Sequence, residues 1–348
     1  MRDKLNQPLT VEGKSSNKKK STRGKSFGYQ VLGFGAGGGG GSPFITATGG
    51  TITCSGNCRI HTFTGPGTFT VCTAAKCAAD NLVSYLVVAG GASAGNCLAG
   101  GGGAGGVREV KSPVTPYTAS PLDGYPSAPN RVTVTEQGYS IVVGAGGASV
   151  NSPSFGRGVA GIASSFAGIS AAGGGGGGTG GPGGNSPTGG TGISGGSGGG
   201  ASGQQNDSVT SGAGNTPPVS PPQGNPGGPS VSQGGGARSG SGGGGATEVG
   251  VNGGSPQIAG RGGAGATTNI SGSPLGYGGG GAGGVQSSGG TAAGRSPCGS
   301  GGSSAASAPG SAGTTNRGGG GGSGAAGTCS FASGAGGSGI VIIRYKIA

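Results

Sequence analysis

Charged side chains are scarce in this 348-residue chain: Asp, Glu, Lys and Arg together make up 8% of it, and only eight residues are acidic. Disordered chains usually combine low hydrophobicity with a high density of net charge, so this scarcity argues against disorder throughout. Long hydrophobic runs are also missing. No stretch of 18 apolar residues exists, so we expect no membrane insertion. Residues 1–28 lack the apolar segment of a signal peptide, so we expect no Sec-type export.

Groups that could perform catalysis are few and scattered. The only histidine is His61, and the acidic residues of the folded part form no close pair that could share general acid and base roles. The stretch VVGAGGASV follows a predicted strand, but Ser149 stands where a dinucleotide-binding motif needs its third glycine. We therefore expect no enzyme activity and no cofactor.

Glycine is the abundant residue. The chain has 99 glycines and 21 prolines, about a third of its length, without the strict Gly-X-Y period of collagen. Such a composition is typical of low-complexity segments. The large apolar residues, however, are concentrated in residues 43–170 and in the last stretch, SGIVIIRYKIA. This distribution predicts one modest hydrophobic core.

Two segments read as strands that are apolar on both faces, residues 82–88 and 340–347. We expect them to pair, so that the last strand completes a sheet begun 250 residues earlier. Turns are predicted at 55–57, 65–67 and 136–138, with a weaker strand around Phe166 and Ile169. The fold class is therefore all-β, a small β-sandwich-like unit over 43–172 that residues 338–348 close.

Residues 173–337 form a long glycine-rich insertion between these parts. Glycine tracts recur in it and alternate with connectors of unlike sequence, such as SPQIAGR and TTNISGSPLGY. Extended rods of the polyproline-II type, with three residues per turn, could pack side by side where glycine leaves no Cβ in the way. A disordered insert is the alternative, because the entropy of ordering glycine nearly cancels the net gain from hydrogen bonds. We favour packed polyglycine-II helices.

The first 42 residues form a basic arm and a glycine-rich linker. Residues 1–28 contain eight basic and two acidic side chains, a net of +6, which is half of the chain's +12. Such an arm is solvated, docks on an acidic protein surface or contacts nucleic acid. The basic residues considered for attachment are Lys14, Lys18, Lys19, Lys20, Arg23 and Lys25.

Four of the seven cysteines stand in close pairs, Cys54 with Cys58 and Cys72 with Cys77. Two local disulfides are geometrically reasonable if the protein functions outside a cell. A zinc site is the rival interpretation, although the spacing departs from the usual C-x2-C, and free thiols are the third.

Several ordered motifs carry a resemblance to a known family. RIHTFTGPGTFTV, SYLVVAGGASAGNCLAGGGGAGG, SIVVGAGG, SSFAGISAAGGGGGG and GGSGIVIIRYKIA resemble, in that order, the glycine-rich domain of bacteriophage tail-fibre and other virion-surface proteins. The resemblance covers residues 45–348. It implies a sandwich of polyglycine-II helices whose connecting loops bind host receptors.

The expected function is that of a phage virion-surface protein, a tail fibre or adhesin at the tail or capsid, assembled in the host cytoplasm. It would attach to other virion proteins through the arm and bind a host-surface glycan or protein, and a homo-oligomer is one option for its assembly. Capsid decoration without receptor binding is one alternative. Nucleic-acid binding through Arg261-Gly-Gly and Arg317-Gly-Gly is a weaker one. Connector residues that stand out by size or charge are the candidate receptor contacts: Gln204, Gln205, Asn206, Asp207, Gln257, Arg261, Asn269, Tyr277, Arg295 and Asn316.

Overall fold

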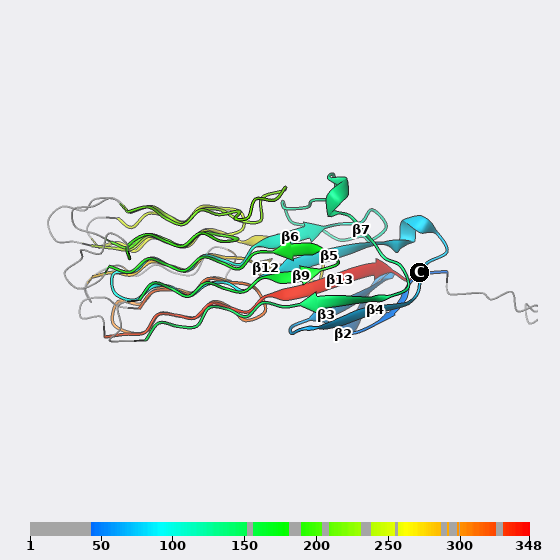
Figure 1. Cartoon of the computed structure of the whole chain (residues 1–348), viewed down its shortest axis with the longest axis horizontal. Coiled ribbons are helices and arrows are strands. Elements are labelled where there is room, and N and C mark those ends of the chain that lie inside the picture. Colours follow the sequence, from blue (N-terminus) through cyan, green and yellow to red (C-terminus); the bar gives the residue numbers. More distant parts are fainter. Residues whose placement is uncertain are drawn as a thin grey trace, which may run out of the picture. The chain divides into compact units, whose positions relative to one another are not determined.

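Residues Phe44–Ala348 form one compact unit in the computed structural model of the chain. The structure describes residues 43–151, 156–180, 189–203, 209–230, 238–254, 257–286, 291, 298, 300–324 and 330–348. Within this unit the strands gather at one end, and long extended segments run away from them side by side (Figure 1).

The described regular elements are thirteen strands and two short 3₁₀ helices. They are β1 (Thr46–Thr48), β2 (Thr51–Ser55), β3 (Cys58–Phe63), β4 (Gly67–Thr73), η1 (Ala78–Asn81), β5 (Leu82–Val88), β6 (Val107–Val110), η2 (Ala128–Asn130), β7 (Val132–Thr133), β8 (Gly138–Val142), β9 (Ser164–Phe166), β10 (Ile169–Ala171), β11 (Ala266–Thr268), β12 (Leu275–Tyr277) and β13 (Ile340–Lys346). The all-β prediction is confirmed.

The strands form two main sheets and a separate hairpin. One sheet has the order β2-β3-β13-β5-β6, with β7 beside β5, and the other has the order β1-β4-β8-β9-β10. β11 and β12 pair with each other. All the ladders between named strands are antiparallel, so the unit is a sandwich of antiparallel sheets, as expected.

β13 lies in the interior of its sheet. It pairs with β5 on one side, Ile342 opposite Leu86, which confirms the predicted partnership. On its other side it pairs with β3, Ile343 opposite His61. The last strand therefore joins two parts of the sheet instead of adding to its edge.

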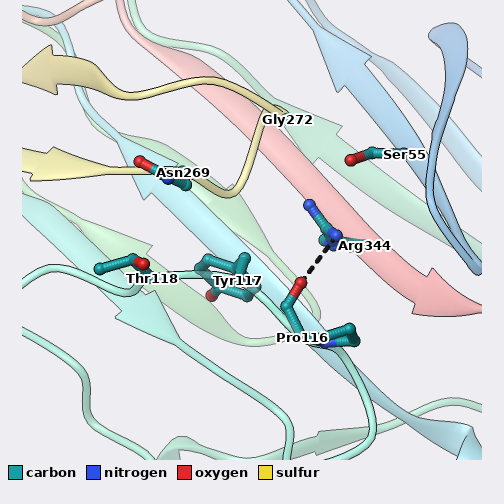
Figure 2. Close-up of a pocket in the computed structure, with 7 residues that line it drawn as sticks. All are labelled: Ser55, Pro116, Tyr117, Thr118, Asn269, Gly272 and Arg344. Atoms are coloured by element: carbon teal, nitrogen blue, oxygen red, sulfur yellow. Dashed lines mark hydrogen bonds between the residues drawn. The ribbon is translucent and has the colours of Figure 1, made fainter.

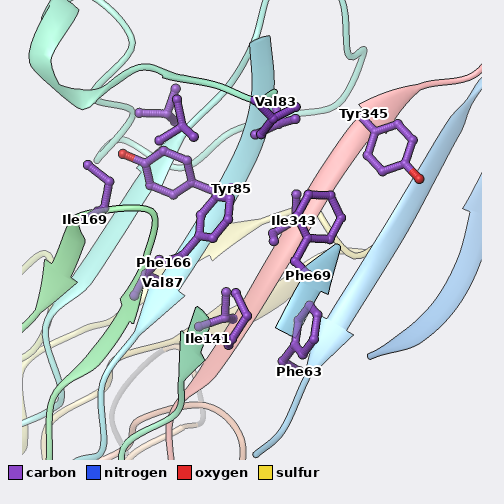
Figure 3. Packing of buried hydrophobic residues seen from close by; sticks show 14 of the residues in the cluster. Phe63, Phe69, Val83, Tyr85, Val87, Ile141, Phe166, Ile169, Ile343 and Tyr345 are labelled. Atoms are coloured by element: carbon purple, nitrogen blue, oxygen red, sulfur yellow. The ribbon is translucent and has the colours of Figure 1, made fainter. Parts of the chain in front are cut away.

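The core between the two sheets buries one apolar face of β5 and of β13. Tyr85 and Ile343 pack there against Phe69, Ile141 and Phe166 from the other sheet (Figure 3). Phe69 and Phe166 meet edge to face, with their ring centroids 6.1 Å apart. These aromatic side chains bury large apolar areas, the main stabilising term of a small sandwich.

The second face of the same strands is covered as well. Leu86 and Ile342 point away from the sandwich core and pack with Ile270 and Tyr277 of the β11–β12 hairpin. The glycine-rich insertion thus supplies the cover for this face. Strands with cover on both sides read as continuous apolar runs, which is the pattern that the sequence shows.

Two of the predicted turns connect different sheets. The turn at 65–67 joins β3 to β4, and the turn at 136–138 joins β7 to β8, but neither pair of strands shares a ladder. Both turns are present, but neither closes a β-hairpin. The glycines and proline reverse the chain locally, and the packing of the two sheets decides where the next strand pairs.

We call these extended segments rods. The backbone hydrogen bonds from one rod to a given neighbouring rod recur every three residues. N–H donors three positions apart in rod 99–106 reach the same neighbouring rod. The first set of bonds goes to the carbonyls of Gly178, Gly175 and Ala172, from Gly100, Gly103 and Gly106 (2.9, 2.9 and 2.8 Å). The second set goes to Ser241 and Gly244, from Gly101 and Ala104 (2.9 and 3.1 Å). The third set goes to Gly321 and Gly318, from Gly102 and Gly105 (3.0 and 2.9 Å). Three residues per turn is the geometry of the polyproline-II helix. The glycine tracts of the insertion that bond in this way, around 175–178, 241–244 and 318–321, are therefore ordered polyglycine-II rods, and the disordered alternative is wrong for them.

Close approach of the rods is what requires glycine. A Cβ built on Gly101 would lie 2.0 Å from the carbonyl oxygen of Gly281, and one on Gly91 would lie 2.1 Å from that of Gly319. Real Cβ atoms do not come this near to a backbone oxygen. The composition that suggests a flexible linker is thus a packing requirement of the bundle.

Candidate functional site

A pocket with a volume of about 370 Å³ opens on the face of the large sheet that carries the β11–β12 hairpin. Figure 2 shows its walls: the loop after β6, the turn between β11 and β12, and the end of β2. Arg344 of β13 lies among them. The lining residues are Ser55, Pro116, Tyr117, Thr118, Asn269, Gly272 and Arg344.

Arg344 ties two walls of the pocket together. One terminal nitrogen donates to the carbonyl of Pro116 (2.9 Å) and the other to that of Ile270 (3.3 Å). The residue is only 3% exposed, its Nε makes no hydrogen bond with any described residue, and no carboxylate in the described part of the chain is paired with it. A guanidinium has five N–H donors, and these two bonds leave most of them without a protein acceptor.

Tyr117 supports this guanidinium through its ring. The ring centroid lies 5.3 Å from Cζ of Arg344 and 5.7 Å from Nζ of Lys111, within the range of cation–π attraction. Asn269 donates its backbone N–H to the carbonyl of Thr118 (2.9 Å), which fixes the two walls to each other. The pocket is therefore built by tertiary contacts, and its walls are not independent loops.

Glu109 lies in β6 on the same face of the sheet as Arg344 and is almost fully buried. Its carboxylate accepts hydrogen bonds from the backbone N–H of Ser120 (3.0 Å) and the hydroxyl of Thr268 (2.6 Å). Burial raises the pKa of Glu109. These bonds engage both of its oxygens in holding the β6 loop to β11.

The structure divides the predicted receptor contacts into groups. Asn269 lines the pocket. Tyr277, a candidate receptor contact, is 1% exposed and packs in the core at the β11–β12 hairpin, so its ring is not available to a receptor there. Asn316 is half-buried and accepts a hydrogen bond from the hydroxyl of Ser338, just before β13 (3.0 Å). Because its side chain is engaged by Ser338, Asn316 is not favoured as a receptor contact.

Two further candidates belong to the rods. The guanidinium of Arg261 forms an ion pair with Glu248 (3.5 Å), and both side chains are partly exposed. Gln257 is half-buried, and its carbonyl accepts a hydrogen bond from the N–H of Thr291 (2.9 Å). The remaining candidates, Gln204, Gln205, Asn206, Asp207 and Arg295, lie outside the described residues, as do the arm residues Lys14, Lys18, Lys19, Lys20, Arg23 and Lys25.

Three connectors begin beside one turn of the bundle. Cys97 and Leu98, both with left-handed backbone (φ 69° and 51°), reverse the chain between rods 89–96 and 99–106. Gly180, the last described residue before connector 181–188, donates to the carbonyl of Cys97 (2.8 Å), and Gly203, before 204–208, donates to that of Leu98 (2.9 Å). Gly156, after 152–155, accepts from the N–H of Asn96 (3.0 Å). The described residues that flank these connectors, Gly156, Gly180 and Gly203, therefore lie beside the same turn.

The predicted local disulfides do not form. Cys54, Cys58, Cys72 and Cys77 are free thiols. The register of β2 and β3 sets Cys54 opposite Arg59 and Cys58 opposite Ser55, so Cys54 and Cys58 point to opposite faces of the sheet. Cys97, in contrast, is disulfide-bonded. No three His, Cys, Asp or Glu side chains come together as a metal site among the described residues, so the zinc alternative finds no support.

His61 is a packed core residue. Its Nδ1 lies 2.7 Å from the carbonyl of Gly49 and its Nε2 lies 3.0 Å from the hydroxyl of Tyr345. A neutral imidazole that donates from Nδ1 and accepts at Nε2 satisfies both contacts. Burial lowers the pKa of His61, which favours this neutral form.

The sequence carries one signal for the pocket, at Arg344. Arg344 stands at an alternate position of the last strand, in phase with Ile340 and Ile342, both of which are buried. An arginine on an apolar strand face must either be paired or line a cavity. Tyr117, Thr118 and Ser55 carried no such signal, because the loops that bring them together have no periodic pattern.

The comparisons with known proteins identify a domain family. A family model described as a glycine-rich domain matches residues 62–346, from β3 to β13. No curated protein matches the sequence. In the described part of the chain, no helix has the length and hydrophobicity to cross a membrane.

Proposed function

Because the chain belongs to the glycine-rich domain family, we propose that it is a virion-surface protein, a tail fibre or adhesin, in which the rod bundle presents connectors to a host-surface glycan or protein. The basic arm attaches it to the particle. The sequence motifs that resemble phage tail-fibre domains suggest this location. The architecture supports a scaffold role for the rods and a recognition role for the connectors.

The observation that carries the proposal is the self-contained hydrogen bonding of the rods. In rod 99–106, each N–H group from Gly100 to Gly106 is donated to a neighbouring segment of the bundle, so the scaffold does not depend on the sequence of the connectors. Recognition residues are commonly placed on loops that a rigid scaffold holds. Amide and guanidinium groups such as those of Gln204, Gln205 and Arg295 offer the directional hydrogen bonds that a hydroxyl-rich glycan requires.

Replacement of connectors tests the proposal. Residues 204–208 and 292–297 are exchanged, separately, for Gly-Ser segments of equal length, and particles that carry each variant are measured for assembly and for adsorption to host cells. Connector 306–309 has the sequence ASAP, without a large polar side chain, and its exchange is the matched control. We expect normal assembly of all variants, and loss of adsorption for one or both of the first two. Normal adsorption of every variant would favour capsid decoration without receptor binding.

The arm has its own test. Deletion of residues 1–28 is expected to abolish incorporation into particles while the β-strand circular dichroism of the purified protein is unchanged. Normal incorporation of the truncated chain would contradict a role of the arm in attachment.

Nucleic-acid binding receives no support from the rods. Gly262 and Gly263, which follow Arg261, lie in a packed rod where Gly263 donates to the carbonyl of Gly243 (2.9 Å), and Arg261 itself is paired with Glu248. Arg-Gly-Gly segments that bind RNA rely on flexible chain.

A further inference from the structure

We propose that the pocket around Arg344 binds a small acidic sugar, with the guanidinium holding the sugar's carboxylate and the pocket rim holding its hydroxyls. This inference does not depend on where the protein acts or on what the rod connectors bind, because the pocket is formed by β2, β13, the loop after β6 and the β11–β12 turn.

The charge of Arg344 is the first argument. A buried cation is normally paired with a carboxylate, because leaving water costs it more than neutral hydrogen bonds return. Arg344 is 3% exposed, and its described partners are two carbonyl groups and the face of Tyr117. Glu109, on the same sheet face, has both oxygens engaged by Ser120 and Thr268. The pocket therefore holds a positive charge that a ligand could balance.

The shape of the donor group is the second argument. A guanidinium is planar and presents parallel N–H groups that match the two oxygens of a carboxylate. Its contacts to Pro116 and Ile270 hold the guanidinium of Arg344 in place, so the second N–H group on each terminal nitrogen is preorganised, while Nε is buried. Nζ of Lys111 lies 5.7 Å from the centroid of the same Tyr117 ring, so a second cation stands close to the site.

The rim supplies the third argument. Ser55 and Thr118 carry hydroxyls and Asn269 carries an amide, and all three line the pocket around the guanidinium (Figure 2). Thr118 is exposed, and Ser55 and Asn269 are half-exposed, so they can reach a ligand without unfolding of the walls. A volume of about 370 Å³ lies at the lower end of the range for small-molecule sites, which suits a single sugar ring.

Binding of three probes to the full chain tests the inference: glucuronate, glucose and acetate, each titrated by calorimetry and by ligand-detected NMR. We expect glucuronate to bind at least about tenfold more tightly than glucose, which lacks the carboxylate, and than acetate, which lacks the hydroxyls. Equal binding of glucose would overturn the role of Arg344. Equal binding of acetate would overturn the assignment of a sugar, and no binding of glucuronate would overturn the site.

Variants locate the binding. Arg344→Gln keeps hydrogen-bond donors but removes the charge, and is expected to weaken glucuronate binding by about tenfold or more. Because this buried substitution can impair folding, Asn269→Ala combined with Thr118→Ala, both at the rim, provides a second measurement with the same expected direction. Asn252→Ala, at an exposed asparagine that does not line the pocket, is the matched control and is expected to bind normally. Unchanged binding by the rim variant and by a folded Arg344→Gln would contradict the site.

Discussion

At the residue scale, the packing of the rods depends on glycine, because it has no Cβ atom. Glycine is used in the rods because a neighbouring carbonyl oxygen occupies the place of its Cβ, and this is as restrictive as any core position. At Gly101 the oxygen of Gly281 would lie 2.0 Å from an added Cβ, whereas at Gly65, in the turn between β3 and β4, nothing lies within 4 Å. The two glycines therefore differ in what they tolerate.

Substitution by alanine tests this difference. Gly101→Ala must push two rods apart and break the bonds that each rod makes with its neighbours, so we expect a loss of at least about 3 kcal/mol of unfolding free energy, or failure to fold. Gly65→Ala is expected to change it by less than about 0.5 kcal/mol. Denaturant unfolding of the two variants gives the comparison. Similar stability of both would mean that the rods are not packed at this distance.

His61 makes stability depend on pH. The folded state holds it neutral, with a pKa below the usual 6.5, while the unfolded chain takes up the proton at 6.5. The stabilisation is therefore complete above pH 6.5 and is lost as the pH falls toward the lower pKa of the folded state, by up to about 1.4 kcal/mol per pH unit. Unfolding free energies measured between pH 8 and pH 5 should show this fall. The His61→Gln variant should lack the part of the pH dependence that His61 contributes. An unchanged slope in the variant would assign the pH dependence to other groups.

At the scale of elements, β13 is the strand on which the large sheet depends. It separates β3 from β5 and contributes apolar side chains to both cores, Ile343 to the one between the sheets and Ile342 to the one under the β11–β12 hairpin. Since its neighbours pair with it along most of their length, no other strand can replace it.

Truncation tests this dependence. Removal of residues 340–348 is expected to leave Leu86 and Val88 of β5 uncovered and to give an aggregated protein, as assessed by size-exclusion chromatography and circular dichroism. Removal of Ala348 alone, an exposed residue, is the control and should be harmless. A longer truncation that stays soluble with its β signal intact would refute the dependence.

The sequence predicted the parts of this fold that have a strong pattern. Both two-faced strands and their pairing were evident, because continuous apolar runs such as Ile340–Ile343 are exceptional in a glycine-rich chain. β11 and β12 were missed, since three residues are too few to show a period. The sequence also did not predict that β4, the strand after Gly65, belongs to a different sheet from β3. Turn residues specify a chain reversal but not the partner of the next strand. The pocket was predicted only at Asn269, as its other residues come together through long-range packing.

At the scale of the whole described unit, Phe44–Ala348, the sheets and the rods form one compact structure. β5 continues directly into rod 89–96, and rod 99–106 continues into β6, so the same chain passes from a β ladder into the bundle and back. The N–H of Ala89 donates to the carbonyl of Gly106 and that of Ala92 to Gly103 (3.0 and 2.9 Å). The bundle is therefore anchored by strands of the large sheet, which offsets part of the entropy cost of ordering glycine.

Amide hydrogen exchange at residues 99–106 tests the central claim, that the glycine-rich rods are an ordered, mutually hydrogen-bonded bundle, most directly. Each N–H from Gly100 to Gly106 has a backbone acceptor in a neighbouring segment, so we expect these seven amides to exchange only through global unfolding, as slowly as those of β5 and β13. The predicted result is a common free energy of opening for the rod and for the two strands. Exchange of residues 99–106 at the rate of an unstructured glycine-rich peptide, while β5 and β13 stay protected, would contradict the account.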